Sequence, residues 1–93
     1  ASPNRWKRRA AAVAFLQEAK RGRRTGEILR VADDLLQDPD DMVRKGVGWL
    51  LKEAYPKKPG EVLAFLRARA VPRLVLRLAA EKMTQRDRAV VLG

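Results

Sequence analysis

Residues 44–54 read RKGVGWLLKEA, and residues 9–19, 35 positions earlier, read RAAAVAFLQEA. The match continues at an offset of 34 between GEIL at 26–29 and GEVL at 60–63. A helix–turn–helix unit that recurs with this period is typical of an α-solenoid, in which stacked helix pairs share a continuous core. We therefore expect an all-α protein, an α-solenoid of about three antiparallel helix pairs, over residues 3–37, 39–70 and 72–93.

Capping residues place the helices within these pairs, because Ser, Thr and Asp favour the N-cap and Pro favours the first helical position. The expected helices cover residues 3–20, 25–37, 39–55, 59–70, 72–83 and a short last helix after 84. Their starts are marked by Ser2 with Pro3, Thr25, Asp38 with Pro39, Pro59, Pro72, and Thr84 in the capping-box sequence TQRD, and Gly22 marks a stop.

Composition limits the function classes. The 93 residues suit one small domain, and 46% apolar residues suffice for a core. Without Cys or His there is no disulfide, thiol nucleophile or imidazole metal ligand, so we expect neither a metal nor a cofactor. The longest apolar run, Ala10 to Leu16, is too short to span a bilayer. The net charge of +10 instead points to a polyanionic partner.

The charge is uneven along the chain. Residues 1–24 carry a net +7, 25–42 a net −5, 43–58 a net +4 and 59–93 a net +4. This pattern has two interpretations, ordinary charged helix faces or a basic surface whose acidic back orients it on its partner. The acids at 33–41 do not have EF-hand spacing, and capping at the start of the third helix explains Asp38, Asp40 and Asp41.

The first predicted helix places arginines on its apolar side. On a helical wheel, Arg5, Arg8 and Arg9 fall within the arc formed by Ala12, Val13, Phe15, Leu16 and Ala19. Burying three unpaired guanidinium groups would be prohibitive, so the inner face should become polar at this end and could bind phosphates. The alternative is pairing with acids of a preceding repeat. Trp6 is expected to be partly buried and to pack on an arginine stem, giving Arg9 a positioning role.

The third predicted helix has an apolar arc of Val43, Val47, Leu50, Leu51 and Ala54. Trp49 points to the opposite side, where its neighbours are Met42, Lys45, Gly46 and Lys52. Such a tryptophan either contacts a ligand or packs against an adjacent repeat. Gly46 and Gly48 each cost about 1 kcal/mol of helix stability relative to Ala, which suggests that another helix or a DNA strand comes close there.

These residues resemble those of a known family. The segment 4–10, NRWKRRA, is similar to the N-x-W-x-R-R-x-A motif of AlkD-like DNA alkylation repair proteins. The segment 43–53, VRKGVGWLLKE, resembles the family's K-A-x-G-W-x-L-R-E helix, and 76–82, LRLAAEK, its closing L-R-x-A-I-E-K helix. The resemblance implies HEAT-like repeats whose basic concave face holds duplex DNA. It also implies a glycosylase that excises cationic N3- and N7-alkylated purines, acting in the bacterial cytoplasm at the nucleoid as a monomer.

The resemblance assigns roles to individual residues. Arg9 corresponds to the family's active-site arginine, which contacts a phosphate near the lesion, and Trp49 to the tryptophan beside the lesion nucleotide. Contacts to the DNA backbone are expected from Arg5, Arg8, Lys45 and Lys52.

One family feature is missing from the sequence. The family's catalytic Asp follows a Trp by four residues and lies upstream of the arginine motif, where only Ala1 to Pro3 stand here. Glu53, Asp33 and Asp34 do not match that position. We therefore expect residues 1–93 to be a single helical-repeat domain, the C-terminal part of a longer array. It should bind alkylated double-stranded DNA, require neither membrane nor metal, and lack catalysis alone.

Two other interpretations remain at the level of sequence. A tetratricopeptide-like adaptor that binds an acidic peptide would suit the period near 34, although the W-x2-L-G-x2-Y pattern is absent. A structural repeat whose charge serves only solubility is the other. A Trp49 fully buried between helices would favour the adaptor.

Overall fold

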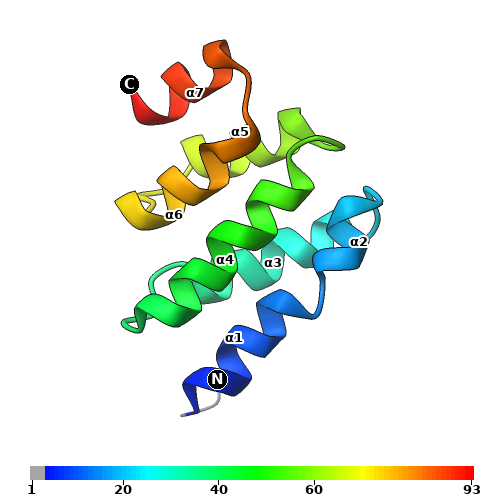
Figure 1. The fold of residues 1–93 in the computed structure, drawn as a ribbon, viewed down its shortest axis with the longest axis vertical. Helices are drawn as coiled ribbons and strands as arrows, with labels where there is room; N and C mark the ends of the chain where they lie inside the picture. Colours follow the sequence, from blue (N-terminus) through cyan, green and yellow to red (C-terminus); the bar gives the residue numbers. More distant parts are fainter. Residues whose placement is uncertain (1–3) are drawn as a thin grey trace.

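The computed structural model describes residues 4–93, which form helices joined by short turns (Figure 1). The described residues contain no strand, so the all-α prediction is confirmed. The elements are α1 (Arg5–Val13), α2 (Leu16–Lys20), α3 (Thr25–Leu35), α4 (Asp41–Ala54), α5 (Pro59–Arg67), α6 (Arg73–Ala79), the 3-10 turn η1 (Ala80–Lys82) and α7 (Gln85–Leu92).

The helices form two layers. In Figure 1, α1, α4 and α6 lie side by side in front and run in the same direction, while α3 and α5 return behind them. We call the exposed side of α1, α4 and α6 the open face. The molecule measures 38 × 26 × 19 Å. This stacking of successive helix pairs is the arrangement expected of a helical-repeat solenoid.

Helix α4 is the centre of the structure and makes its most extensive contacts with α6 on one side and α1 on the other. Its predicted apolar arc is fully buried, at the positions Val43, Val47, Leu50, Leu51 and Ala54. Burying one valine or leucine side chain contributes about 1.5–3 kcal/mol to the free energy of unfolding, so this arc is a large part of the core. Helix α4 is covered by α1 on one side, by α6 on the other and by α3 from behind, so the side that it presents to solvent is the open face.

The first predicted helix is divided in two, which corrects the expectation of one helix to Lys20. The Phe15 N–H bonds to the Ala12 carbonyl at 3.2 Å, in the tighter 3-10 pattern, and the chain bends between α1 and α2. The bend allows both segments to pack on α4. The N-cap is Asn4, whose side chain accepts hydrogen bonds from the Trp6 and Lys7 N–H groups. The predicted cap, Ser2 with Pro3, lies outside the described residues.

Several other boundaries shift by a few residues. Helix α3 begins at Thr25 itself, with Arg24 as its N-cap, and α4 is capped by Asp40 rather than Asp38. The cap moves because Asp38 is held by an arginine of α1 and accepts the Asp40 N–H at 3.0 Å. Predicted ends at 37, 70 and 83 are too late, since α3, α5 and α6 stop earlier. Pro59 at the start of α5 and Gly22 after α2 are confirmed.

The last helix is fixed to the end of α4 by one tyrosine. Tyr55, which is 5% exposed, donates from its hydroxyl to the Asp87 carboxylate and accepts the Thr84 N–H at 3.3 Å. Thr84 also caps α7 by accepting the Asp87 N–H at 3.1 Å, as its capping-box pattern predicts.

Among the described helices, none has the length and apolar character needed to cross a bilayer.

Candidate nucleic-acid interface

The open face of α4 carries Lys45, Trp49 and Lys52, spaced so that they follow one side of the helix. Lys45 is exposed, and Trp49 is half-buried and packs against the core with part of its ring surface. The predicted position of Trp49 outside the apolar arc therefore agrees with its partial exposure. A rigid aromatic surface flanked by two cations is well suited to contact a nucleotide.

Arg9 crosses from α1 to α4 over Gly46. A Cβ atom placed on Gly46 would lie only 3.1 Å from the Arg9 Cγ and 3.7 Å from its Nε, so the glycine makes room for the arginine stem. Gly46 and Trp49 are three residues apart on the same helix and are therefore neighbours on its surface. The structure thus places the Arg9 stem against α4 at Gly46, three positions before Trp49, although Arg9 and Gly46 are far apart in the sequence.

The guanidinium of Arg9 is incompletely satisfied within the protein. Its Nε is buried, and no hydrogen-bond partner for it lies among residues 4–93. A buried N–H without an acceptor costs about 1–3 kcal/mol. Of the three arginines that the sequence places on the apolar side of α1, Arg5 and Arg8 form ion pairs, whereas Arg9 forms none among residues 4–93.

Gly48 has a different role from Gly46. A Cβ atom there would lie 2.7 Å from the Leu78 Cβ and 2.9 Å from its Cδ1, closer than real side chains approach. Gly48 therefore allows α6 to pack directly on the α4 backbone. The prediction that another helix comes close at these glycines is confirmed at both, since a Cβ on Gly46 would also lie 3.7 Å from the Arg9 backbone carbonyl oxygen of α1.

Arg8 is held inside the protein rather than presented to solvent. Its Nε donates to the Asp38 Oδ2 at 2.6 Å and its Nη2 to Oδ1 at 3.2 Å, and the two side chains are 14% and 7% exposed. This bidentate bond lowers the pKa of Asp38 below its ordinary value, and raises the pKa of Arg8. Asp38, the acid that pairs with this arginine, belongs to the α3–α4 loop of the same chain.

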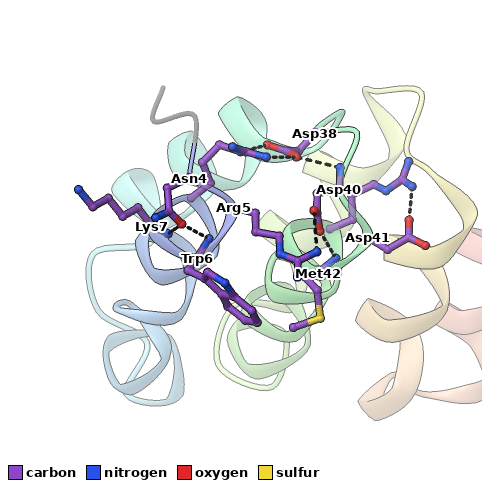
Figure 2. Close-up of polar contacts among 10 residues, drawn as sticks. Asn4, Arg5, Trp6, Lys7, Asp38, Asp40, Asp41 and Met42 are labelled. Carbon is purple, nitrogen blue, oxygen red and sulfur yellow. Dashed lines mark hydrogen bonds and ion pairs between the residues drawn. The ribbon is translucent and has the colours of Figure 1, made fainter.

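Arg5 is drawn toward the same loop but more loosely (Figure 2). Its Nη1 lies 3.5 Å from the Asp40 Oδ2, and its guanidinium lies 5.0 Å from the Trp6 ring centroid. Trp6 itself is 55% exposed. Trp6 therefore does contact an arginine, namely Arg5, but it is more exposed than the partly buried side chain that the sequence predicts.

Two lysines at the far end of α4 and beyond it are paired with acids. The Lys52 Nζ lies 3.3 Å from the Glu81 Oε1, and the Lys82 Nζ lies 2.8 Å from the Glu53 Oε1. The hydrogen bond from Lys82 lowers the pKa of Glu53, which is 8% exposed. Glu53 follows Trp49 by four residues, but its carboxylate is engaged by Lys82.

Two other acids considered from the sequence, Asp33 and Asp34, lie on α3, behind α4 in Figure 1. Asp33 belongs to α3 and bonds Arg69 at 2.7 Å, at the edge of an open groove of about 520 Å³ between α3 and α5. Asp34 is exposed on the same helix. Asp41, the first residue of α4, forms an ion pair with Arg44, three positions further along the same helix. No group of three or more acidic side chains within residues 4–93 is arranged to hold a metal ion.

No local pattern predicts the Arg8–Asp38 and Arg5–Asp40 pairs, because their members are 30 and 35 positions apart. The signal that the sequence does contain is the opposite sign of the charge in residues 1–24 and 25–42, which has two interpretations, charged helix faces or a basic surface with an acidic back. In the structure α1 and the α3–α4 loop lie side by side, so part of this opposite charge is neutralised between them.

Comparison with known proteins adds one finding. The family model of the DNA alkylation repair enzyme matches residues 1–83, which include α1 to α6 and η1. No significant match to a curated protein or to a solved structure was found. Since the family model covers most of the sequence, including the arginine motif, the glycine–tryptophan helix and α6, the chain belongs to the DNA alkylation repair enzyme family.

Proposed function

We propose that the chain binds duplex DNA on its open face and is part of a glycosylase that excises cationic N3- and N7-alkylated purines. The observation that carries this proposal is that the Arg9 stem lies against α4 at Gly46, three positions before the half-buried Trp49 on the same helix. Membership of the DNA alkylation repair family supports DNA as the partner.

The chemistry of such a site follows from the charge of the damaged base. A cationic alkylpurine is already a good leaving group, so the protein mainly has to hold the DNA and stabilise positive charge that develops on the sugar. Arg9 offers N–H donors to a phosphate oxygen, and phosphate contacts fix the register of a protein on DNA. Trp49 offers an aromatic surface for the nucleotide next to that phosphate.

A carboxylate that could stabilise the sugar cation is not supplied by the neighbours of Trp49. Glu53 is paired with Lys82, and Glu81 with Lys52. We therefore propose that residues 1–93 bind DNA but require a further carboxylate for base excision. Incubating the chain with methylated duplex DNA should release no 7-methylguanine, and release would place the catalytic carboxylate within this chain.

Binding is tested with the 93-residue chain and a fluorescent duplex. Affinity should fall steeply with salt, because each phosphate contact releases counterions. Arg9→Ala should weaken binding, whereas Arg67→Ala, an exposed position on α5, should have a much smaller effect. Absence of binding at low salt, or binding independent of salt, would refute the proposal.

Trp49 provides a second readout. In a Trp6→Phe background its fluorescence reports on the open face alone, since the chain has two tryptophans. DNA should quench or shift this emission in parallel with binding. Unchanged emission at saturating DNA would remove Trp49 from the interface.

The alternative of a tetratricopeptide-like adaptor for an acidic peptide is not favoured, because Trp49 is not fully buried between helices.

A further inference from the structure

Two basic turns meet at the edge of the molecule where α2 and α4 end. The turn 21–24 joins α2 to α3, and the turn 55–58 joins α4 to α5, and both lie on the right in Figure 1. We call the basic residues Arg21, Arg23, Lys57 and Lys58 the turn edge. The α2–α4 packing brings these residues together from sequence positions more than 30 apart.

Gly22 is the contact point between the two turns. It has a φ of +68°, and a Cβ atom on it would lie 3.0 Å from the Lys57 Cβ and 3.8 Å from the Lys58 Cε. Only glycine combines this backbone conformation with such a close approach. The stems of the two lysines therefore lie directly against the turn that carries Arg21 and Arg23.

The charge of the turn edge is uncompensated. Within residues 4–93 no ion pair is formed by any of its four members, and Arg21, Arg23 and Lys57 are exposed. The adjacent Arg24 differs, since its Nη2 lies 2.7 Å from the Glu27 carboxylate. Bringing four like charges together without ion-pair partners opposes folding, so an external anion would relieve this repulsion.

The opposite edge of the molecule shows the reverse situation. There Arg5 and Arg8 face Asp40 and Asp38, so much of the charge of the arginine motif is neutralised by the protein itself. The sequence placed the phosphate-binding charge at the start of the first helix. Within residues 4–93, Arg9 and Lys45 form no ion pair on that side, and four further basic residues without ion pairs lie together at the turn edge.

The separation of these two groups suits a DNA groove. From Lys45 to the end of α4 at Ala54 the helix rises about 14 Å, at about 1.5 Å per residue. The major groove of B-DNA is about 12 Å wide between its two phosphate backbones. A duplex with one backbone at Arg9 and Lys45 would therefore bring its second backbone to the turn that follows Ala54.

We propose that the turn edge binds the second phosphate backbone of the duplex, across the groove from the strand at Arg9. This proposal rests on the proposed function, because it needs DNA on the open face. It adds a phosphate-binding surface formed by the turns between helices, and it makes Gly22 the residue that positions that surface.

The test compares two variants that each remove four positive charges. The edge variant is Arg21→Gln, Arg23→Gln, Lys57→Gln and Lys58→Gln. The control variant removes charge from exposed positions on α3, α5 and α7 and is Arg30→Gln, Arg67→Gln, Arg86→Gln and Arg88→Gln. Glutamine keeps the apolar stem, so the contact between Lys57 and Gly22 is preserved. Circular dichroism establishes that both variants fold.

Binding of an unmodified duplex is measured at several salt concentrations. Each lost phosphate contact lowers the slope of log affinity against log salt by about 0.9, so the edge variant should lose up to about 3.6 from the slope. The control variant should keep most of the wild-type slope. If the full edge variant does not fold, the two half-variants, at 21 and 23 or at 57 and 58, should each lose about half as much.

The outcomes separate this inference from the proposed function. A wild-type slope in the edge variant, or equal losses in the edge and control variants, overturns the inference. If Arg9→Ala then still weakens binding, the proposed function stands without the turn edge. If the wild-type chain does not bind DNA, both fail. Edge-dependent binding of polyglutamate, with DNA binding unaffected by the edge variant, would identify an acidic protein as the partner and overturn the inference.

Discussion

Replacing Gly48 with alanine should destabilise the protein, although alanine is the better helix former. The new Cβ would lie 2.7 Å from the Leu78 Cβ and 2.9 Å from its Cδ1. Rotation of the leucine side chain relieves the second contact but not the first, because a Cβ is fixed to the backbone. Helix α6 must therefore move away from α4, and α4–α6 is one of the two most extensive helix contacts in the structure.

The expected magnitude is the difference between two terms. Alanine gains up to about 1 kcal/mol over glycine within a helix. Overpacking a well-packed contact costs about 1–3 kcal/mol. We expect a net loss near 1 kcal/mol in the free energy of unfolding, which corresponds to a fall in Tm of about 4–8 °C for a domain of this size.

The assay is urea unfolding followed by circular dichroism, with Gly26→Ala as the matched control. Gly26 lies near the start of α3 and a Cβ on it would meet nothing within 4 Å, so this change should stabilise the protein by about 0.4–1 kcal/mol. A double-mutant cycle with Leu78→Gly isolates the contact, because that change removes the opposing Cβ. The overpacking cost of Gly48→Ala should largely disappear in the Leu78→Gly background.

The reasoning would be refuted by a Gly48→Ala variant that is as stable as Gly26→Ala. That result would mean that α6 does not rest on the α4 backbone at this point. A coupling energy near zero in the cycle with Leu78→Gly would lead to the same conclusion, whatever the sign of the single-variant effect.

Three further predictions concern the polar contacts and the second glycine. Gly46→Ala should leave stability within about 1 kcal/mol of wild type, since its propensity gain offsets displacement of the Arg9 stem, yet it should weaken DNA binding in an anisotropy titration. Asp38→Asn should destabilise the protein at pH 7 by leaving Arg8 without its carboxylate. Because folding lowers the pKa of Asp38, its contribution to stability is fully present above the ordinary aspartate pKa of about 4 and is lost as the pH falls below that value, through the lowered pKa of the folded state, so urea-unfolding curves of variant and wild type should converge in that acidic range. Tyr55→Phe should cost about 1.5–3 kcal/mol, the usual worth of a hydrogen bond to a charged group, and hydrogen exchange should show earlier opening of α7; unchanged α7 protection would contradict the role of the hydroxyl.

Local pattern was sufficient for most of the helical framework. The apolar arc of α4 repeats with the helical period, so its buried residues follow from spacing alone, and Pro59 and Thr84 mark helix starts by their own backbone chemistry. The boundary at Asp38 failed for a reason outside local pattern. Its carboxylate is taken by Arg8, 30 residues earlier, and Asp40 becomes the cap instead.

The candidate site divides in the same way. Trp49 could be placed on the open face from the helical wheel, because orientation around one helix axis depends only on that helix. The sequence could not show which arginine of α1 is left without an ion pair. Arg5, Arg8 and Arg9 share one arc of the helix and differ only in the neighbours that α4 and the loop before it bring to them.

The sequence by itself determined the helical repeat, the buried side of α4, the strong net positive charge and the family resemblance, all of which depend on residue type and short-range spacing. Only the tertiary structure decided which charges cancel. Asp38 and Asp40 meet arginines of α1, whereas Arg21, Arg23, Lys57 and Lys58 lie in adjacent turns and form no ion pair within residues 4–93. Charges interact through distance in space, and residues 30 positions apart acquire that distance only when the helices stack.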